Sequence, residues 1–575
     1  MQKEMNGAEI MVKSLEDLGV KRVFGYTGAT ILPVYHALGG SSIAITINAN
    51  EQSAAFSAAG YSRSSDSVGV AVVTSGPAIT NTLTAVADSF ADSIPLIVFA
   101  GQVQQSRLDT DEFQHINVKS VFAKAAKKVL QITDKSDIEE TIKDAFFFAK
   151  SGKPGPVVID FPMDAQRKKG LYRGIEIERY RLKYDQETHL GKNQCKQFFD
   201  LLGSAKRPLL YIGGGMNNKA ASEKIRAFNR KFNIPSINSL MGKGVLDENF
   251  DTSLGMLGMF GTPYANMAIQ ETDLFVAFGV RWNDRVTQKV GESGLKAEIA
   301  YIDINPAKVQ EVRVTRSPKF SFIGDAATVL EDLIEYSREN PVKLKIGEWQ
   351  RHVNSLKKSF PLAYNSDAAE IQAAEVIDLL SRNVTDDMKF TTGVGNHQML
   401  AAQYLLPKRP KSFMSSGAFG TMGFSMPCSI GVYFANPGSK VIAIDGDGSL
   451  KMNMGEIHTI GSLGIPIKVL LLNNHADGMV RTIQAVFYDR QFTGSERNYD
   501  ANFANIAKEC GFKWCRKISK REDLEPAMKE FLAAEGPCFL EVVTDREEGV
   551  YPVIPQGKGY KDMVLGPFIK EVTEG

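Results

Sequence analysis

Residues 441–474, VIAIDGDGSLKMNMGEIHTIGSLGIPIKVLLLNN, carry the pattern that decides the fold. Two aliphatic runs of strand length, 441–445 and 467–472, each end in polar residues, and the stretch between them is long enough for a crossover helix. Parallel strands joined by such a crossover bring both polar ends to the carboxyl edge of one sheet, where open α/β sheets bind ligands. The sequence therefore predicts a parallel sheet with Asp447 and Asn474 at that edge.

The two polar ends have the composition of a site for a divalent cation and a diphosphate. Mg²⁺ takes a few protein oxygens together with phosphate oxygens, and a carboxylate and an amide carbonyl supply the protein share. Backbone N–H groups at a helix start after Gly446-Asp447-Gly448 would bind the phosphates. An ordinary tight turn accounts for Gly-Asp-Gly alone, whereas its pairing with Asn473-Asn474 at this spacing favours the metal site.

Length and composition limit the kinds of protein. A chain of 575 residues is expected to form about three domains, because single cores stop growing near ~250–300 residues. Its 67 basic and 66 acidic residues give no charge excess for nucleic acid or an anionic membrane, so we expect small-molecule partners. The five cysteines contain no CxxC pair, which favours a reducing cytoplasm over a disulfide framework or a zinc site. We expect no signal peptide and no membrane span, because the amino-terminal stretch carries acidic residues and no apolar run is long enough.

Apolar runs that alternate with helical stretches predict an α/β protein with three doubly wound parallel-sheet domains. We place these domains at residues 1–180, 190–340 and 365–575. Polar connectors with little apolar periodicity are predicted at 166–195 and, rich in Lys and Arg, at 336–365.

Separated motifs occur in all three domains. They are NEQ at 50–52, TSGPAITN at 74–81, DEFQ at 111–114, GGG at 213–215, LMGKG at 240–244, LGMFGTPYAN at 257–266, GVRWNDR at 279–285, GVGNHQM at 393–399, SSGAFGTMGF at 415–424, GDGS at 446–449 and NNHADGMV at 473–480. Together they resemble the FAD-containing acetolactate (acetohydroxyacid) synthase group of thiamine diphosphate (ThDP) enzymes over nearly the whole chain. The resemblance implies, in order along the chain, a pyrimidine-binding domain, a central FAD-binding domain and a diphosphate- and Mg²⁺-binding domain.

The resemblance also implies the catalytic residues. Glu51 matches the glutamate that hydrogen-bonds N1′ of the ThDP aminopyrimidine, and in this family it comes from another subunit. A glutamate after Ala-Asn is otherwise an acid at a helix start, stabilised by the helix dipole. The other matching catalytic positions are Ala29, Phe113 and Gln114.

The third domain matches the ThDP and metal site of the family. Asp447, Asn474 and the backbone carbonyl of Ala476 match the Mg²⁺ ligands, and Met422 matches the large apolar residue over which the cofactor bends. A methionine in isolation indicates packing only. The remaining cofactor-binding positions that match are Gly395, Asn396, His397, Gly446, Gly448, Ser449, Gly478 and Met479. A buried core imidazole is the alternative for His397.

The middle domain matches the FAD-binding segments of the family. The matching positions are Gly213, Gly214, Gly215, Leu240, Met241, Gly258, Met259, Arg281 and Arg285. Three consecutive glycines are by themselves more typical of a flexible turn than of a phosphate cradle, so the flavin prediction rests on the segments around Gly258 and Arg281. In this family the flavin performs no net redox chemistry.

The chain departs from the biosynthetic pattern around the substrate. The family usually reads PGGA where this chain has Thr27-Gly28-Ala29-Thr30, a lysine at the channel entrance is Met163, and the tryptophan that favours 2-ketobutyrate as acceptor is Ile483. There are three further departures: this chain has Asn50 where the family has a histidine, His115 where it has a glutamate, and Asp477 where it has a leucine. Loss of a cation and of an aromatic wall favours a bulkier acceptor, although Arg285, which binds an acceptor carboxylate in the family, remains. Neutral change within a true synthase is the alternative.

We therefore expect a carboligase that depends on ThDP, Mg²⁺ and FAD. It would decarboxylate pyruvate and transfer the hydroxyethyl unit to a carbonyl acceptor, as a homodimer or homotetramer with active sites at the subunit interface. With pyruvate as acceptor the product is 2-acetolactate. The departures keep open a ketone of a nucleotide-activated sugar, as in the yersiniose-pathway carboligase, or another non-acid ketone.

Three other functions fit the sequence less well. A simple decarboxylase commonly uses an adjacent His-His pair, which does not occur among the seven histidines. Glyoxylate carboligases lack the glutamate that matches Glu51. A non-catalytic paralogue is disfavoured because Glu51, Asp447 and Asn474 are all present.

Overall fold

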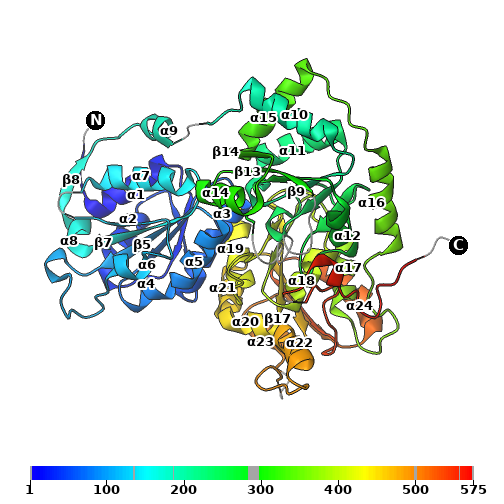
Figure 1. Ribbon diagram of the computed structural model, residues 1–575. Coiled ribbons are helices and arrows are strands. Elements are labelled where there is room, and N and C mark those ends of the chain that lie inside the picture. The colour runs from blue at the N-terminus through cyan, green and yellow to red at the C-terminus, as the bar shows by residue number, and fades with distance from the viewer. Residues whose placement is uncertain are drawn as a thin grey trace.

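The computed structural model describes residues 3–133, 136–184, 187–282, 297–497, 501–555 and 557–572. It contains three six-stranded sheets whose strands are all parallel, and one small two-stranded sheet (Figure 1). The predicted α/β fold with three parallel-sheet domains is therefore confirmed. No helix in the described ranges combines the length and the apolar content needed to cross a membrane.

The first domain holds a sheet in the order β3-β2-β4-β5-β7-β6. Its strands are β2 (Arg22–Gly25), β3 (Ala44–Ile47), β4 (Gly69–Val73), β5 (Leu96–Gln102), β6 (Lys128–Gln131) and β7 (Pro156–Pro162). Its helices are α1 (Gly7–Asp17), α2 (Leu32–Gly39), α3 (Glu51–Ser64), α4 (Pro77–Asn81), α5 (Leu83–Asp92), α6 (Val118–Phe122), α7 (Ile138–Lys150) and α8 (Met163–Arg167). Every residue of β4, β5 and β7 is buried, which is why these strands are continuous apolar runs rather than alternating ones.

The middle domain holds a sheet in the order β11-β10-β9-β12-β13-β14. Its strands are β9 (Pro208–Ile212), β10 (Ser236–Asn238), β11 (Ser253–Met256), β12 (Leu274–Phe278), β13 (Glu298–Asp303) and β14 (Phe320–Ile323). The helices around it are α10 (Lys192–Ser204), α11 (Lys219–Phe232), α12 (Pro263–Glu271), α14 (Pro306–Arg316) and α15 (Ala326–Glu339). Phe198, Phe228 and Phe278 pack together in its core.

The third domain holds a sheet in the order β16-β15-β17-β18-β20-β19. Its strands are β15 (Met388–Thr392), β16 (Phe413–Met414), β17 (Lys440–Gly446), β18 (Ile467–Asn473), β19 (Trp514–Ile518) and β20 (Cys538–Val543). Its helices are α17 (Ala373–Arg382), α18 (Asn396–Tyr404), α19 (Ser425–Ala435), α20 (Asp447–Leu450), α21 (Gly455–Leu463), α22 (Gly478–Phe487), α23 (Phe503–Glu509) and α24 (Leu524–Ala533). The strands β17 and β18 are parallel neighbours with Val441 opposite Ile467, as the opening sequence predicts.

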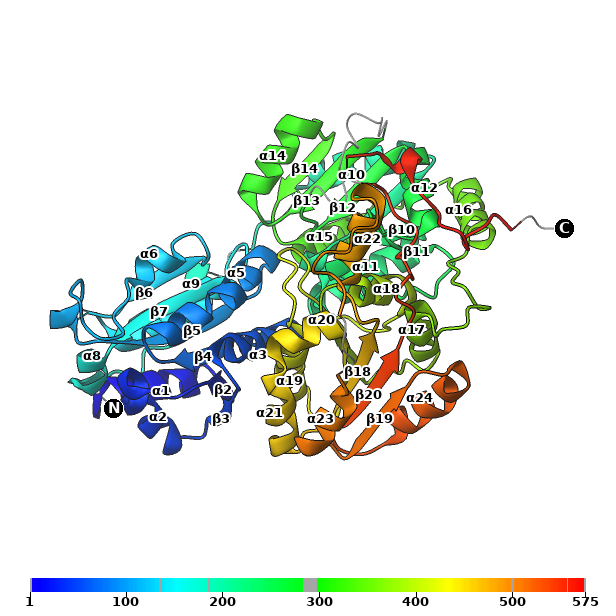
Figure 2. The same ribbon diagram turned by 90° about the horizontal axis from the view of Figure 1, so that it is seen from below.

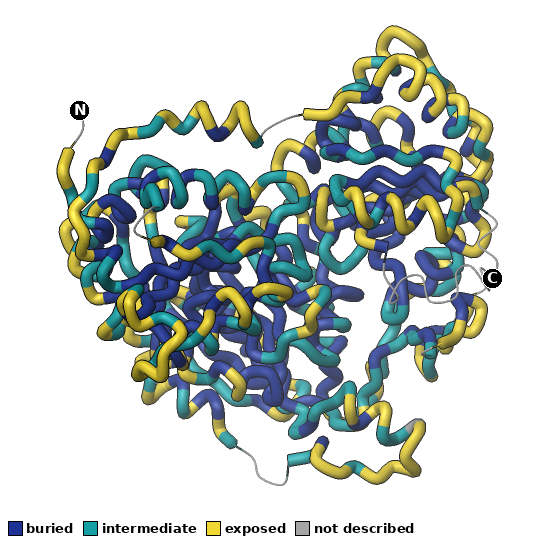
Figure 3. Tube along the Cα trace, turned by 60° about the vertical axis from the view of Figure 1, so that its left-hand side comes forward, coloured by how far each residue is buried: buried dark blue, intermediate teal, exposed yellow. Residues whose placement is uncertain are grey.

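Both predicted connectors contain regular structure that their composition did not show. Within 166–195 the strand β8 (Lys169–Tyr172) pairs antiparallel with β1 (Lys3–Asn6), and α9 (Glu178–Tyr184) follows. Figure 3 shows this segment running along the outside of the first domain, mostly exposed. Within 336–365 the helix α16 (Gly347–Ser359) buries Trp349 and Val353 in the core of the middle domain.

Helices α3 and α19 join the first and third domains (Figure 2). A Cβ added at Gly60 of α3 would lie 2.3 Å from the carbonyl oxygen of Cys428, and one at Gly431 of α19 would lie 1.8 Å from that of Ser57. Glycine at both positions therefore lets the two backbones approach closely. One buried apolar cluster runs from the first domain into the third across this contact.

Candidate cofactor and metal site

The fold places the predicted metal ligands at neighbouring strand ends. Strand β17 ends at Gly446 and Asp447 begins α20, while β18 ends at Asn473 and Asn474 follows. In the parallel register Gly446 lies opposite Leu472, so both polar ends emerge at the carboxyl edge of the sheet.

Asp447 sits in a protected and charged environment. Only 2 % of the residue is exposed, and burial raises the pKa of its carboxyl to about 6 against the lowering effect of Arg497. Arg497 Nη1 donates to Asp447 Oδ2 at 2.7 Å, and Nη2 donates to Asp477 Oδ1 at 2.6 Å. Nothing in the sequence indicated a role for Arg497, which comes from a segment with no motif of its own.

The loop 474–477, named the metal loop for its two predicted metal positions Asn474 and Ala476, is held in place by hydrogen bonds. The N–H of Ala476 donates to Asn474 Oδ1 at 3.2 Å, and His475 has a positive φ of 54°. The N–H of Asp477 donates to the carbonyl of Ser495, and the N–H of Arg497 donates to the carbonyl of His475. These contacts fix the loop after β18 beside the strand-like segment that carries Arg497.

Three predicted glycines let separate segments meet around Asp447. A Cβ added at Gly446 would lie 2.6 Å from His397 Nδ1, and one at Gly448 would lie 2.2 Å from Asp477 Oδ1. A Cβ at Gly478 would lie 2.5 Å from the Nδ2 atom of Asn396. The starts of α18, α20 and α22 therefore converge in one backbone cradle that larger residues would fill.

Polar atoms in this cradle are buried without a hydrogen-bond partner among the described residues. They are Asn396 Oδ1, His397 Nε2, Asp445 Oδ2 and Arg497 Nε. His397 Nε2 lies 3.5 Å from Asp445 Oδ1, but without hydrogen-bond geometry. Burial lowers the pKa of His397 to about 3 and raises the pKa of Asp445 to about 7, so the imidazole is neutral at neutral pH. Unpaired buried groups are costly, and a polar ligand with several donors and acceptors fits this cradle.

Met422 is tied to the same cradle through its neighbour. The N–H of Gly423 donates to Ser449 Oγ at 2.9 Å, and Asn453 Nδ2 donates to the carbonyl of Gly423 at 2.9 Å. The loop that carries Met422 is thereby fixed to α20 and the turn after it. Met479, at the start of α22, packs against the apolar core of the third domain.

The predicted catalytic residues of the first domain gather at the carboxyl edge of its own sheet. Glu51 is the first residue of α3, where Asn50 caps the helix and Asn81 Nδ2 donates to Glu51 Oε2 at 2.9 Å. Gln114 has a positive φ of 60°, and its Cβ lies 2.9 Å from the position of a Cβ added at Gly76. Within the described part of the chain, neither Glu51 nor Gln114 has a hydrogen bond to the metal loop.

Ala29 and Phe113 lie on the surface of that edge. Ala29 is exposed at the start of a 3₁₀ turn (Ala29–Ile31) after β2, and Phe113 is 84 % exposed. Thr30 Oγ1 lies 2.7 Å from Thr74 Oγ1, and Gln166 Nε2 donates to the carbonyl of Thr30 at 2.8 Å. The backbone that presents Ala29 is thus held firmly in place.

The predicted flavin positions meet at the strand ends of the middle domain. A Cβ added at Gly213, after β9, would lie 2.1 Å from the carbonyl oxygen of Gly279, after β12. Gly214 faces Met241, whose sulfur would lie 2.4 Å from a Cβ added at Gly417 of the third domain. These contacts bring the glycine turn against the loop 415–424.

The other flavin positions are more dispersed. Arg281 Nη1 donates to the carbonyl of Ala91 in the first domain at 3.1 Å. The Gly258 N–H donates to Asn266 Oδ1, and the Met259 carbonyl accepts from the N–H of Ile554. Leu240 packs against the third-domain core, and Arg285 lies outside the described residues.

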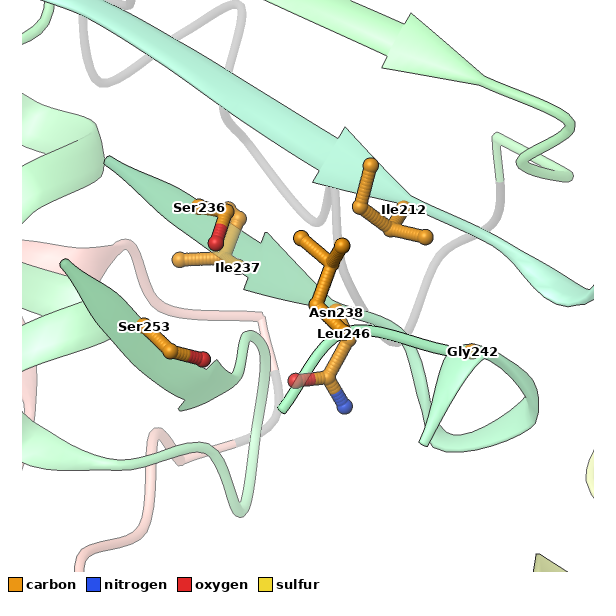
Figure 4. A pocket seen from close by; sticks show the side chains of 7 residues that line it. All are labelled: Ile212, Ser236, Ile237, Asn238, Gly242, Leu246 and Ser253. Atoms are coloured by element: carbon orange, nitrogen blue, oxygen red, sulfur yellow. The ribbon is translucent and has the colours of Figure 1, made fainter. Parts of the chain in front are cut away.

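Figure 4 shows the side chains around a small recess beside strands β9, β10 and β11 of the middle domain. It is lined by Ile212, Ser236, Ile237, Asn238, Gly242, Leu246 and Ser253. The recess has room for about one water molecule, so it is not a site for a cofactor of dinucleotide size.

Comparison with known proteins agrees with this geometry. The family models described as the N-terminal TPP (thiamine pyrophosphate, ThDP) binding domain, the central domain and the C-terminal TPP binding domain of thiamine pyrophosphate enzymes match residues 5–121, 195–333 and 393–542. Fold and site together define a three-domain ThDP-dependent enzyme.

Individual relatives narrow the class. Acetolactate synthase 1, chloroplastic, of Zea mays is 37% identical over 575 residues, covering 97% of this chain and 88% of that protein. Acetolactate synthase, chloroplastic, of Arabidopsis thaliana is 37% identical over 574 residues, covering 97% and 84%. The acetolactate synthase large subunit of Pyropia yezoensis is 35% identical over 569 residues, covering 98% and 95%. The chain belongs to the acetolactate synthase family of ThDP enzymes.

Proposed function

We propose that this protein is a carboligase of the transferase/lyase class that uses ThDP, Mg²⁺ and FAD. It decarboxylates pyruvate and joins the two-carbon unit to a carbonyl acceptor. The observation that carries the proposal is the convergence of Asp447, Asn474 and unpaired buried polar atoms in one backbone cradle at the sheet edge.

Each group of the cradle has a role in this proposal. The Asp447 carboxylate, the Asn474 amide oxygen and the Ala476 carbonyl hold the cation, and the N–H groups at the start of α20 bind phosphate oxygens. Met422 supports the cofactor from the loop that Ser449 fixes. ThDP supplies, when bound, a thiazolium ring that accepts the electrons released by decarboxylation.

We assign the acid–base role to Glu51 and place it in trans. Glu51 of one subunit serves the metal site of another in a homodimer or homotetramer. This placement is supported because Glu51 bonds to Asn81 rather than to its own metal loop in the described structure. Phe113 of the first domain and Phe487 at the end of α22 in the third domain are 84 % and 68 % exposed, as expected of surfaces that a second subunit covers.

FAD is assigned to the middle domain as a structural cofactor. The support is the close approach of Gly213 and Gly215 to Gly279 at the ends of β9 and β12, where parallel sheets bind ligands. The purified protein should be yellow, with one FAD per chain that pyruvate alone does not extensively reduce. A colourless protein that neither binds nor needs FAD would contradict this assignment.

The acceptor is a 2-keto acid or another ketone. The side chains at Ile483 and Met163 favour a bulkier ketone as the second candidate. Ile483 on α22 is 52 % exposed and narrower than the tryptophan of the family pattern, and Met163 at the start of α8 carries no charge. A ketone on a nucleotide-activated sugar, or another non-acid ketone, would use the space that these residues leave. Pyruvate as acceptor would give 2-acetolactate.

One incubation tests the reaction class. The protein is mixed with pyruvate, ThDP, Mg²⁺ and FAD, with and without a non-acid ketone, and the products are identified by mass. Addition products of the two-carbon unit support a carboligase. Acetaldehyde as the sole product would indicate a decarboxylase, and unconsumed pyruvate under all conditions would overturn the proposal.

A further inference from the structure

One guanidinium group links the proposed metal carboxylate to a second carboxylate. Arg497 Nη1 lies 2.7 Å from Asp447 Oδ2 and Nη2 lies 2.6 Å from Asp477 Oδ1. The Arg497 side chain is 15 % exposed and that of Asp477 29 % exposed, so this chain of three charges is mostly shielded from water. Asp477 is also one of the positions where the sequence departs from the family pattern.

The backbone builds this arrangement rather than leaving it to flexible side chains. Ala476 and Glu496 form an antiparallel bridge, and the Asp477 and Arg497 N–H groups are bonded across it. A Cβ added at Gly448 would lie 2.2 Å from Asp477 Oδ1 and 2.7 Å from Arg497 Nη2. The ion pair therefore rests directly on the peptide that begins α20.

The charges of Arg497 and Asp477 have opposite effects on a cation bound by Asp447. A guanidinium bonded to Asp447 takes one of its oxygens and places a positive charge close to the metal position, which weakens cation binding. The negative charge of Asp477 offsets that of the guanidinium, and its carboxylate is a second partner for Arg497. Arg481, the next arginine of the region, bonds instead to Glu496 and Glu547.

We propose that Asp477 and Arg497 form a charge-balancing pair that sets the affinity of Asp447 for its divalent cation. Arg497 competes with the cation for the Asp447 carboxylate, and Asp477 offsets that competition by binding the same guanidinium. Both are positioning residues, and the inference rests on the proposed metal role of Asp447.

The pair predicts shifts in opposite directions. Arg497→Gln should lower the cation concentration at half-saturation by about tenfold, because Asp447 loses its internal competitor. Asp477→Asn should raise that concentration by a similar factor, because Arg497 then remains on Asp447 alone. The double variant should resemble Arg497→Gln, and Arg497→Lys should stay closer to the unaltered protein because the charge is kept.

The measurement uses Mn²⁺ as the probe. Full-length protein is stripped with a chelator and titrated with Mn²⁺ at one fixed concentration of ThDP, the same for every variant, and free Mn²⁺ is followed by electron paramagnetic resonance. Circular dichroism and thermal melts check that each variant is folded. Arg490→Gln is the matched control, since Arg490 lies in the same region, 58 % exposed, and pairs with Glu547. The Mn²⁺ concentration at half-saturation should not change in Arg490→Gln.

The outcomes separate the pair from the metal site. Unchanged Mn²⁺ binding by Asp447→Ala would show that the proposed metal site is wrong. If Asp447→Ala loses Mn²⁺ but both Arg497→Gln and Asp477→Asn weaken binding, the pair is a structural brace and the inference fails. Loss of ThDP retention in Arg497→Gln would equally overturn it, since Arg497 would then be binding an anion.

Discussion

The carboxylate of Glu456 accepts a hydrogen bond from the backbone N–H of Ala49, with 2.8 Å between Oε1 and N. Glu456 lies on α21 of the third domain, and Ala49 is two residues before Glu51. Asn48 Nδ2 donates to the other Glu456 oxygen at 3.1 Å, and Ser53 Oγ donates to Asn453 Oδ1 at 3.2 Å. The start of α3 is therefore fastened to the segment that follows Asp447.

Replacing Glu456 should destabilise the junction between the first and third domains. Glu456→Ala removes the acceptor of the Ala49 N–H and one of the two acceptors of the buried Asn48 amide, which keeps its hydrogen bond to Ser57 Oγ, at a cost of about 1–3 kcal/mol. Glu456→Gln keeps one acceptor and should cost less. Thermal unfolding followed by calorimetry measures the difference. Glu530→Ala, which removes a half-exposed partner of Arg516, is the control, and an equal effect from it would contradict the prediction.

Glu51→Gln should leave folding and ThDP binding nearly intact and remove most activity. The amide keeps the size of the side chain and the cap by Asn50 at the start of α3, but it cannot exchange a proton. Acid–base groups of this kind contribute about 10²–10⁴-fold. Turnover and bound ThDP are measured on the same preparation. A loss of only a few fold would show that Glu51 is a helix-start acid and no more.

Asp447→Ala should abolish retention of ThDP, because a cation that bridges to the diphosphate loses its anionic protein ligand. Cofactor content after gel filtration measures the effect. Asp386→Ala, which removes the exposed partner of Arg409 in the same domain, should retain the cofactor. Equal cofactor content in the two variants would mean that Gly-Asp-Gly is an ordinary turn.

The sequence predicts the place of Asp447 and Asn474 at the sheet edge well because the signal is local. Each strand of the pair β17–β18 is a continuous apolar run, and Asp447 and Asn474 follow directly from where those runs end. Strand β8 and helix α9 were missed because the antiparallel pairing of β8 with β1 joins residues about 165 positions apart in a polar stretch.

Contacts between segments that are distant in the sequence could not be predicted from it either. Glu456 and Ala49 are separated by 407 positions, and no periodicity links an acid on α21 to the start of α3. Arg497 meets Asp447 only because the segment at 495–497 folds back on the loop after β18. The sequence could have indicated that Asp445 is buried, since a carboxylate at the end of the apolar run VIAID is typical of a buried polar group.

Asp160 should make stability depend on pH. Burial raises the pKa of this carboxyl on β7 to about 6, against the lowering effects of Gln131, which donates to Asp160 Oδ2 at 2.7 Å, and of Gln102. The folded state therefore binds the proton more tightly than the unfolded state, so the stability contribution is full below the unfolded value of 3.8 and is lost as pH rises through 6. Asp160→Asn cannot ionise and should be stabilised at pH 8, by at most about 3 kcal/mol. The gain in Tm should be larger at pH 8 than at pH 5, and equal shifts at both would contradict the assignment.

The acceptor specificity should depend on the side chain at Ile483. Ile483 is 52 % exposed on α22, and Phe487, one turn further on, is 68 % exposed. Ile483→Trp fills space beside these side chains and should shift selection from bulky non-acid ketones toward 2-keto acids. One such change in a pocket is worth about 1–3 kcal/mol, or roughly 10–200-fold in relative kcat/KM.

A mixed-acceptor assay measures that shift as the ratio of the two products formed from pyruvate, a second 2-keto acid and a non-acid ketone together. Thr482→Trp is the control, because it adds the same side chain at the neighbouring exposed position of α22. The side chain at 482 points to a different side of the helix from that at 483. A ratio that changes in Ile483→Trp alone locates the acceptor beside Ile483. If the unaltered protein makes only 2-acetolactate at a high rate and ignores every non-acid ketone, then Ala29, Met163 and Ile483 are neutral replacements, and the site selects keto acids by other means, with Arg285 the first residue to test.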